Sequence, residues 1–551
     1  MIETEGEASV SFLLDCGQFQ GSTSQEAKNF EPFPFNPAAI DFLILSHAHV
    51  DHCGRIPLLV KAGFKGRIYC TAATADLLPI ILRDCAHIHE KDAEWKNRKG
   101  QRAGKEPVEP LYTTAEAEDS FDFITPVLYD QEVAPAEGIR FTLLDAGHIL
   151  GSAITEVRVN EGGKKTKLVY TGDLGVDSMP LLRDPVKVRH ADVVIMETTY
   201  GARTREKHEP SVERLSGIIE DTIHRGGTVL IPSFAVGRTQ ELIYDLSELF
   251  ERRNAALFRN VMVYVDSPMA TAATGAFRKN IQDFDAKYKE LVMAGDDPLD
   301  FTNLEFTHST EESKTLNANM KPKVIISASG MCEAGRILHH LKHRLWDSNS
   351  TVAFVGFQAE GTLGRRLIDG AKTVSVMGEA IDVNAKIVSL EGFSAHADRD
   401  GLLEWVQGFD APPETIFLVH GEAEAKAAFK ETLKNGTGID ATVIDEYCCW
   451  DLGASVKAES PAQASEGRQG RQTARADRVP VDPEDAERLL EKLRSVNDNV
   501  EGLLYRAKLA AMEAMDDEDE ERYISLKNLI VSLESDTSKL AGALADRRRG
   551  H

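Results

Sequence analysis

Short apolar runs that end in a histidine or a carboxylate recur along this 551-residue chain. Turns and helical stretches separate these runs, as in VSFLLD, DFLILSH, IRFTLLDAGH, KLVYTGD and VVIME, and this pattern predicts strands of a mixed α/β fold. Five polar residues fall just beyond predicted strand ends: Asp15, His47, His148, Asp173 and Glu197. Because α/β folds and sheet sandwiches hold their chemistry at strand ends, we expect these side chains to lie close together.

The alternation of strands and helices changes near residue 205 and again near residue 383. Between these points, strand, turn and helix repeat as in a doubly wound α/β domain. The earlier pattern of strands ending in histidine then returns. The simplest interpretation is a first domain made of residues 1–204 and 384–452, with residues 205–383 inserted into it.

The C-terminal part of the chain has a different composition. Residues 453–481 are small and polar, as expected of a flexible linker. Residues 482–551 carry apolar side chains at alternating steps of three and four, which predicts two heptad helices. Such helices form an antiparallel hairpin or join two chains as a coiled coil, so a homodimer formed through this tail is one expectation.

The stretch LSHAHVDHCG carries four metal-ligand side chains within six positions. In an extended segment His47, His49 and Asp51 would point the same way, with His52 at the start of the following helix. Neutral imidazoles and a carboxylate that converge in this way suit divalent metals, zinc first. The motif therefore predicts a metal site.

Further ligands are predicted at the ends of other strands. The candidates are His148 in AGHILGSA, Asp173 in YTGDLG and His420 in FLVHGE. A histidine or aspartate at a strand end can also simply cap a turn. An aspartate between two metals can bridge them with its two oxygens, and paired metals activate a water for attack on a phosphodiester.

These motifs together resemble the β-CASP branch of the metallo-β-lactamase fold. The resemblance rests on HAHVDH, GHILGSA, TGD, METTYG, GFSAHAD and VHGE, and it covers roughly residues 2–450. The branch includes the endonuclease subunit of the cleavage-and-polyadenylation factor and ribonuclease J. The implied fold is α/β, a metallo-β-lactamase αββα sandwich with an inserted doubly wound β-CASP domain, followed here by the C-terminal helical hairpin or coiled coil.

The resemblance also implies roles for the site residues, with two zinc ions per chain. It assigns His47, His49 and His148 to one zinc, Asp51, His52 and His420 to the other, and Asp173 as the bridge. Asp15 would orient ligand histidines from behind them. His396 would act as general acid toward the leaving oxygen, held by Glu197, since a histidine poised by a carboxylate can donate a proton near neutral pH.

Two loops of the inserted domain, PSFAVGRTQE and SASGMCEAGR, precede predicted helices. Backbone amides at a helix N-terminus, together with hydroxyls and guanidiniums, can bind phosphate. The resemblance implies that these loops line an RNA cleft, although such turns also occur purely as packing. The predicted substrate-binding residues are Ser233, Arg238, Ser329, Gly330, Arg336 and Ser394.

Charge and composition limit the other classes of function. The net charge of −25 argues against general affinity for nucleic acid, so we expect arginines and lysines of the inserted domain to gather at the cleft. The seven cysteines show no CxxC spacing. There is no apolar run near the roughly 18 residues that span a bilayer and no signal-peptide pattern, so no membrane partner and a cytoplasmic location are expected.

The favoured hypothesis is therefore a dinuclear-zinc ribonuclease, an endonuclease or a 5′-exonuclease in RNA processing or decay. Two alternatives stay open: a hydrolase of small thioesters or lactams, and a non-catalytic scaffold that binds partners through its tail. Relatives typically begin with a strand before the segment IETEG, where this sequence starts, so we also expect an edge strand to be missing from the first sheet.

Overall fold

The structure, a computed structural model, describes residues 1–4, 9–21, 23–101, 104, 106–252, 261–444, 449–450, 452 and 458–459. The predicted linker and helical tail lie outside these residues, except for positions 458–459 of the linker. In the described part of the chain, no helix is long and apolar enough to cross a membrane. The expected cytoplasmic location and the homodimer stay predictions.

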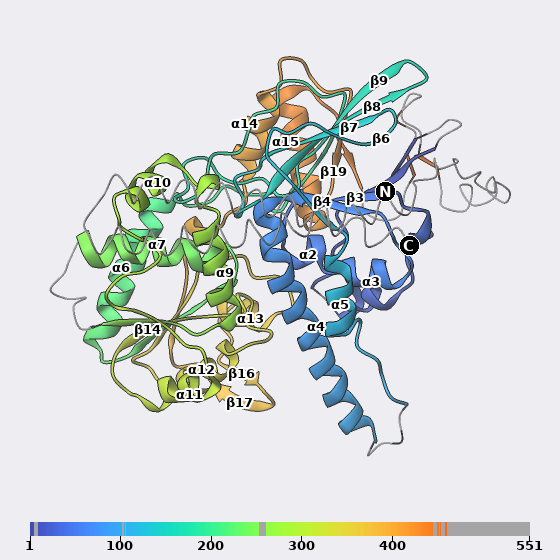
Figure 1. The fold of residues 1–551 in the computed structure, drawn as a ribbon. Coiled ribbons are helices and arrows are strands. Elements are labelled where there is room, and N and C mark those ends of the chain that lie inside the picture. Colours follow the sequence, from blue (N-terminus) through green and yellow to red (C-terminus); the bar gives the residue numbers. More distant parts are fainter. Residues whose placement is uncertain are drawn as a thin grey trace, which may run out of the picture. The chain divides into compact units, whose positions relative to one another are not determined.

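Two sheets face each other in the first domain (Figure 1). The first sheet has the order β1 (Ile2–Glu3), β2 (Ser11–Leu14), β3 (Phe42–Ile44), β4 (Arg67–Thr71) and β5 (Ile124–Val127). The second has the order β20 (Thr442–Val443), β19 (Thr415–Leu418), β10 (Val193–Met196), β9 (Lys164–Tyr170), β8 (Ala153–Glu161), β7 (Ile139–Asp145) and β6 (Val133–Ala136). A short hairpin, β21 (Cys449–Trp450) with β22 (Ala458–Glu459), follows.

The inner faces of the two sheets share one apolar core. Phe12 and Phe42 of the first sheet stack with ring centroids 4.9 Å apart, and they pack with Phe141 and Val157 of the second. Strand β7 alternates buried and more exposed residues along its length, as a strand with one face in a core must. This alternation fixes the register of the sandwich, because a slip of one residue would turn the apolar side chains outward.

Helices cover the outer faces of both sheets and complete the αββα sandwich. The helices on the side of the first sheet are α1 (Thr23–Ala27), α2 (Val50–Cys53), α3 (Ile56–Lys61), α4 (Ala72–Gln101) and α5 (Thr114–Phe121). The second sheet is covered by α14 (Arg399–Gln407) and α15 (Ala423–Thr437), through Trp405 and Phe429 on Val194 and Met196.

The inserted domain is a six-stranded parallel sheet with helices on both faces, coloured green to yellow in Figure 1. Its strand order is β13 (Leu304–Phe306), β12 (Met262–Val265), β14 (Lys323–Ser327), β11 (Thr228–Pro232), β15 (Thr351–Phe354) and β18 (Lys386–Ser389). The helices are α6 (His208–His224), α7 (Arg238–Arg252), α9 (Pro268–Lys279), α10 (Ala286–Met293), α11 (Thr310–Ala318), α12 (Ile337–Arg344) and α13 (Leu363–Ile368), beside a hairpin of β16 (Thr373–Val376) and β17 (Glu379–Asp382). The predicted fold class is thus confirmed.

One domain boundary differs from the sequence-based expectation. Strand β18, which lies after the expected division at residue 383, pairs with β15 of the inserted sheet along its whole length. The chain therefore returns to the first domain after Ser389. At the other end, β1 lies in the IETEG segment itself, pairs antiparallel with β2 and forms the edge of the first sheet. The strand that we expected to be missing would precede this segment, so that expectation stays a prediction.

Candidate metal centre

The HAHVDH segment forms a loop and a short helix rather than an extended strand. Strand β3 ends at Ile44, and α2 begins at Val50, so Asp51 lies in the helix and not in line with His47 and His49. The prediction that these three side chains point one way is wrong for Asp51. The helical turn carries its carboxylate, together with His52, toward a different group of ligands, because helical residues do not alternate in direction.

One group of ligands consists of His47, His49, His148 and Asp173. The His49 Nδ1 atom lies 3.1 Å from His47 Nε2 and 3.2 Å from His148 Nε2. The Asp173 Oδ2 atom lies 3.4 Å from His47 Nε2 and 3.5 Å from His148 Nε2. Ligands about 2.0–2.1 Å from a tetrahedral ion are about 3.3 Å apart, so these four atoms fit one metal.

A second group consists of Asp51, His52 and His420. The other oxygen of Asp173, Oδ1, lies 3.3 Å from His52 Nε2 and 3.6 Å from His420 Nε2. His420 Nε2 is 3.8 Å from Asp51 Oδ2. The two oxygens of Asp173 therefore face two separate groups of ligands, as a bridging carboxylate would.

Two buried atoms in the second group have no hydrogen-bond partner among the described residues, His52 Nε2 and Asp173 Oδ1. Leaving buried polar atoms without partners costs free energy unless something else binds them. These two atoms face each other and the second ligand group. Their orientation supports a metal ion as the missing partner.

The electrostatics of His47, His49 and His148 fit metal binding. Burial, reinforced by the neighbouring histidines, lowers the pKa of His47 and His148 well below 6.5, and burial lowers that of His49 to about 4. These rings are therefore neutral, the form that binds metals. Burial also lowers the pKa of His52, but the charges of Asp173 and Asp15 outweigh it and raise the pKa well above 6.5.

The loop after β9 places the bridging carboxylate. Gly172 has a φ of 53°, and a side chain there would meet Ser46, with a Cβ only 2.7 Å from the Ser46 Cβ. Glycine is therefore needed for the tight turn between β9 and Asp173. Asp173 is 2% exposed, and the charges of His52 and His420 overcome its burial and hold its pKa well below 3.8.

Asp15 lies behind the ligands and binds one of them directly. It follows β2 with a φ of 61° and accepts a hydrogen bond from His52 Nδ1 at 2.6 Å. Its two oxygens also accept from the Ser46 backbone N–H and hydroxyl, each at 2.7 Å, and from the Tyr170 hydroxyl at 2.6 Å. A carboxylate bound to Nδ1 keeps the proton there and leaves His52 Nε2 free for the metal.

Glu197 and His396 lie next to the first group of ligands. The Nδ1 atom of His396 is 3.2 Å from Glu197 Oε1 and 3.9 Å from Asp173 Oδ2. Burial lowers the pKa of His396, but the charges of Glu197 and Asp173 raise it above 6.5 overall. Glu197 also accepts from the backbone N–H groups of Leu174 at 2.6 Å and Thr199 at 3.2 Å. Since its carboxylate is already bound by protein donors, Glu197 fits the role of a partner of His396 better than that of a metal ligand.

Comparison with known proteins assigns the family. Residues 2–175 match the model of a metallo-beta-lactamase superfamily domain, residues 239–367 a Beta-Casp domain, and residues 380–444 a Zn-dependent metallo-hydrolase RNA specificity domain. The chain belongs to the β-CASP family. A similar protein is Ribonuclease TTHA0252 of Thermus thermophilus, 36% identical over 421 residues, with 76% of this chain and 90% of the relative covered.

Two other β-CASP relatives come from Methanocaldococcus jannaschii. The RNase J-like protein is 33% identical, with 76% of this chain and 89% of the relative covered. Transcription termination factor FttA is 32% identical over 432 residues, which cover 77% of this chain but only 65% of that relative. The match to FttA therefore spans less than two thirds of its length.

The predicted substrate-binding residues of the β-CASP domain take part in internal contacts. Arg238 is 7% exposed and pairs with Glu241, and the Arg336 guanidinium binds Asp266 at 2.6 Å. Ser233 is buried, and its hydroxyl accepts from Thr239, whereas the Ser329 hydroxyl accepts from backbone N–H groups of its own loop. Gly330 packs against Phe234, and the Ser394 carbonyl accepts from Arg205. These contacts favour packing over direct substrate binding for both arginines and for Ser233.

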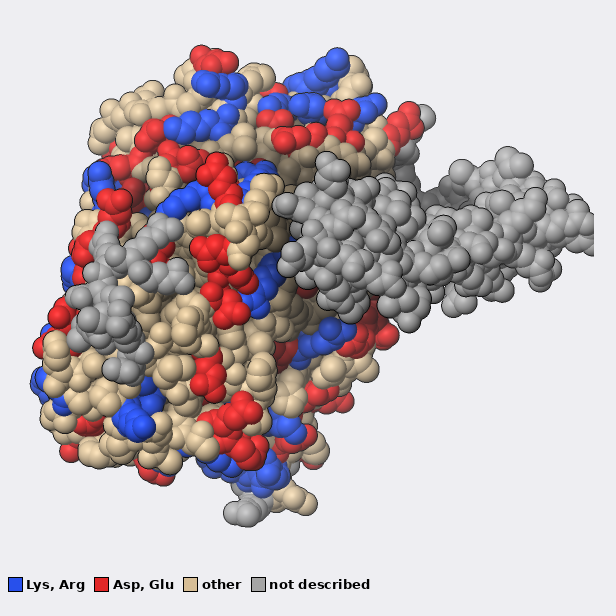
Figure 2. Space-filling view, turned by 60° about the vertical axis from the view of Figure 1, so that its left-hand side comes forward, with Lys and Arg blue, Asp and Glu red and all other residues tan. Residues whose placement is uncertain are grey.

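The charged side chains that line the groove between the two domains are mostly acidic. A groove of about 1400 Å³ runs between the segment after β2 and helix α4 on one side and the loops of Phe234 and Ser329 on the other. Its charged lining consists of Lys61 and Lys96 with Glu26, Glu31, Asp92, Glu109 and Glu333. The expectation of a basic cleft is thus wrong for this groove, and Figure 2 shows lysine and arginine interspersed with aspartate and glutamate on another face.

Sequence reasoning missed several residues around the site. Ser46 and Tyr170 bind Asp15, and the buried Tyr200 places its ring centroid 6.1 Å from that of His396. The Phe234 ring lies 6.3 Å from the His49 ring at the groove. Ser46 and Tyr200 belong to the motifs LSHAHVDH and METTYG, which had already been singled out. Their position in these motifs was the signal by which the sequence could have indicated them.

Proposed function

We propose that this chain is a ribonuclease that hydrolyses RNA phosphodiester bonds with two zinc ions per chain. The observation that carries the proposal is the position of the Glu197–His396 pair, beside two groups of ligands that share Asp173. A metal centre with an adjacent proton donor suits cleavage of an ester whose leaving oxygen needs a proton.

The proposed ligands of one zinc are His47, His49 and His148, and those of the other are Asp51, His52 and His420, with Asp173 shared. Bound in this way, the ions would activate a water and neutralise charge on the phosphate. Histidine and carboxylate ligands suit zinc, and the matching domain model is named as Zn-dependent.

His396 is the proposed acid. Its Nδ1 is bound to Glu197, which leaves Nε2 to carry the proton toward the leaving oxygen. In the reaction the attacking water loses one proton to solvent and its oxygen forms a bond to phosphorus. The bond from phosphorus to the ribose oxygen breaks, and that oxygen keeps the electron pair and takes the proton from His396. The raised pKa of His396 favours the protonated ring before the reaction.

The relatives support RNA as the substrate, since the most similar ones described above carry the names ribonuclease and RNase J-like. The small-molecule hydrolase is the second candidate, and the acidic lining of the groove is the observation in its favour. Against it stands the inserted domain, because small substrates need no second lobe beside the metals.

The test is incubation of the zinc-loaded protein with end-labelled RNAs that carry either a 5′-phosphate or a 5′-hydroxyl. We expect metal-dependent cleavage, and product lengths distinguish internal cuts from stepwise 5′ removal. His396→Ala should slow cleavage by about 10²–10⁴-fold with unchanged zinc content. His190→Ala is the matched control, because His190 is an exposed histidine outside the site. Absence of RNA cleavage, together with hydrolysis of a thioester, would overturn the proposal.

A further inference from the structure

We infer that Arg205 is a positioning residue that holds the His396 loop, residues 390–398, in the geometry needed for proton donation to the leaving group. The inference rests on the proposed role of His396 as the acid. Arg205 lies where the chain passes from the first domain into the inserted one, and the His396 loop lies where the chain passes back.

Arg205 donates two hydrogen bonds to the His396 loop, one before His396 in the chain and one after it. Its guanidinium Nη1 donates to the Ser394 carbonyl at 2.6 Å, two residues before His396. Its backbone N–H donates to Asp398 Oδ2 at 3.0 Å, two residues after His396. Hydrogen bonds from a charged donor are among the stronger ones in proteins, and the first of these depends wholly on the arginine side chain.

The rest of the loop has backbone anchors that would survive loss of the side chain. The Ala397 N–H donates to the Leu174 carbonyl at 2.8 Å, and the Arg399 N–H donates to the Arg203 carbonyl at 3.0 Å. Both anchors follow His396 in the chain. On the preceding side, the Leu390 N–H donates to the Phe354 carbonyl at 2.8 Å and the Gly392 N–H donates to the Ser211 hydroxyl at 3.1 Å. Removal of the guanidinium therefore releases the Ser394 carbonyl, directly before Ala395 and His396.

The guanidinium also packs beside the ring that borders His396. Its Cζ lies 5.4 Å from the centroid of the Tyr200 ring, which is 4% exposed and adjoins the His396 ring. Arg203 contacts the same ring at 4.8 Å, but its guanidinium reaches Glu391 and not the Ser394 carbonyl. Because Arg203 contacts this loop as well, the matched control is Arg189, an exposed arginine that pairs with Asp410 away from the loop.

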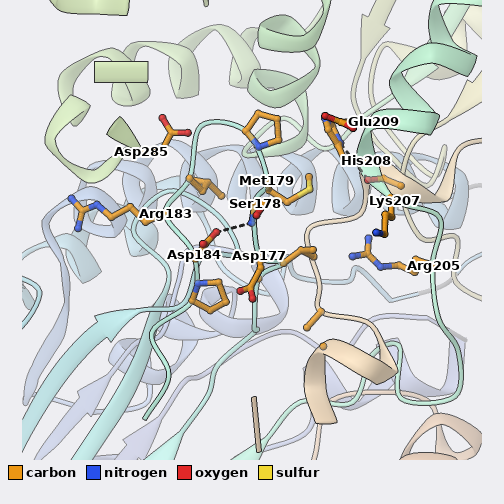
Figure 3. A pocket seen from close by; sticks show the side chains of 18 of the residues that line it. Asp177, Ser178, Met179, Arg183, Asp184, Arg205, Lys207, His208, Glu209 and Asp285 are labelled. Carbon is orange, nitrogen blue, oxygen red and sulfur yellow. Dashed lines mark hydrogen bonds between the residues drawn. The ribbon is translucent and has the colours of Figure 1, made fainter. Parts of the chain in front are cut away.

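A cavity of about 960 Å³ lies behind the loop and gives access to Arg205. Its wall includes Leu174, Ala397 and Asp398, which are neighbours of the bridging carboxylate and of His396 in the chain. In Figure 3 Arg205 and Lys207 lie together on one side of this cavity, opposite Arg183 and Asp184. Small cations can therefore reach the place that the arginine side chain occupies.

The experiment compares two substrates in the zinc-loaded full chain. One is RNA, whose leaving ribose oxygen needs a proton, and the other is bis(p-nitrophenyl) phosphate, whose weakly basic leaving group needs none. For Arg205→Ala we expect kcat on RNA to fall by about 10- to 100-fold, with KM and zinc content unchanged, because small displacements of a catalytic group cost rates of this order. Hydrolysis of the p-nitrophenyl ester should stay within about twofold, since it bypasses the acid.

Three further variants test the link to His396. Arg205→Lys should recover part of the rate, because an ammonium can donate to the Ser394 carbonyl, and millimolar guanidinium should partly restore Arg205→Ala. The double variant Arg205→Ala with His396→Ala should be no slower on RNA than His396→Ala alone, because groups that act as a unit are not additive. Arg189→Ala should cleave both substrates at the normal rate.

Equal slowing of both substrates by Arg205→Ala would overturn the inference, because that pattern indicates general damage to the metal centre. An unchanged rate on RNA would overturn it as well. Failure of the proposed function gives a different result: His396→Ala would then slow both substrates equally or neither, whatever the Arg205 variants do.

Discussion

Replacement of Asp15 by asparagine should weaken zinc binding without removing a metal ligand. The two side chains have nearly the same shape, and asparagine tolerates the left-handed backbone conformation that Asp15 adopts at φ 61°. The change therefore alters hydrogen bonding at constant packing. Its main effect should fall on His52, whose Nδ1 lies 2.6 Å from Asp15 Oδ2.

The size of the expected loss in zinc affinity depends on which ring nitrogen of His52 carries the proton. In Asp15→Asn one amide oxygen can still accept from the Ser46 backbone N–H, and the NH₂ group then stands where Oδ2 accepted three hydrogen bonds. An NH₂ group next to Nδ1 forces the neutral ring to carry its proton on Nε2, the atom that faces Asp173. Loss of such partners costs about 10- to 100-fold in metal affinity, which is about 1.4–2.8 kcal/mol.

The assay is competition for zinc between the protein and a chromophoric chelator, with total zinc measured by elemental analysis. We expect one of the two sites to weaken by that factor and the other to change little, because Asp15 contacts only the second group of ligands. Asp41→Asn is the matched control, since the exposed Asp41 accepts from the Ser11 N–H and touches no ligand histidine. An Asp15→Asn protein that binds both ions as tightly as the unmodified protein would refute the reasoning.

Three other predictions concern charge, pH and metal removal. Glu197→Gln should lower kcat on RNA by about tenfold or more at neutral pH, because loss of this carboxylate lowers the pKa of His396. The zinc content should stay unchanged. An unchanged pH–rate profile would contradict this prediction. Burial raises the pKa of Asp145 from 3.8 to about 7, so ionisation of this group destabilises the fold as pH rises through that range. Asp145→Asn should therefore leave the midpoint of thermal unfolding unchanged near pH 4. Above pH 7 it should raise the free energy of unfolding by at most about 4 kcal/mol. Equal effects at both pH values would disprove the raised pKa of Asp145. Removal of metal with a chelator should lower the unfolding temperature, with recovery on addition of zinc, because a ligand that binds only the folded state stabilises it.

The αββα sandwich and the assignment of the ligands to two metals were implied by the resemblance to the β-CASP family, whereas the strand-end pattern and the HAHVDH motif alone predicted a mixed α/β fold, an inserted doubly wound domain and a metal site. Each of these depends on local features, such as apolar alternation along a strand or four ligand types within six residues. The direction of Asp51 was predicted wrongly because the helix begins at Val50, two residues before the expected start at His52. Element boundaries depend on tertiary packing as well as on local preference.

The sequence by itself therefore determined which residue types could bind metal and in which motifs they lie. Only the tertiary structure decided which groups support them: Tyr170 beside Asp15, and Arg205 at the Ser394 carbonyl. The same holds for Arg336, whose guanidinium pairs with the buried Asp266 instead of lining an open cleft. The physical reason is that a motif fixes only short-range geometry, whereas these pairs join residues of different strands and domains, and their contact exists only after the sheets have packed.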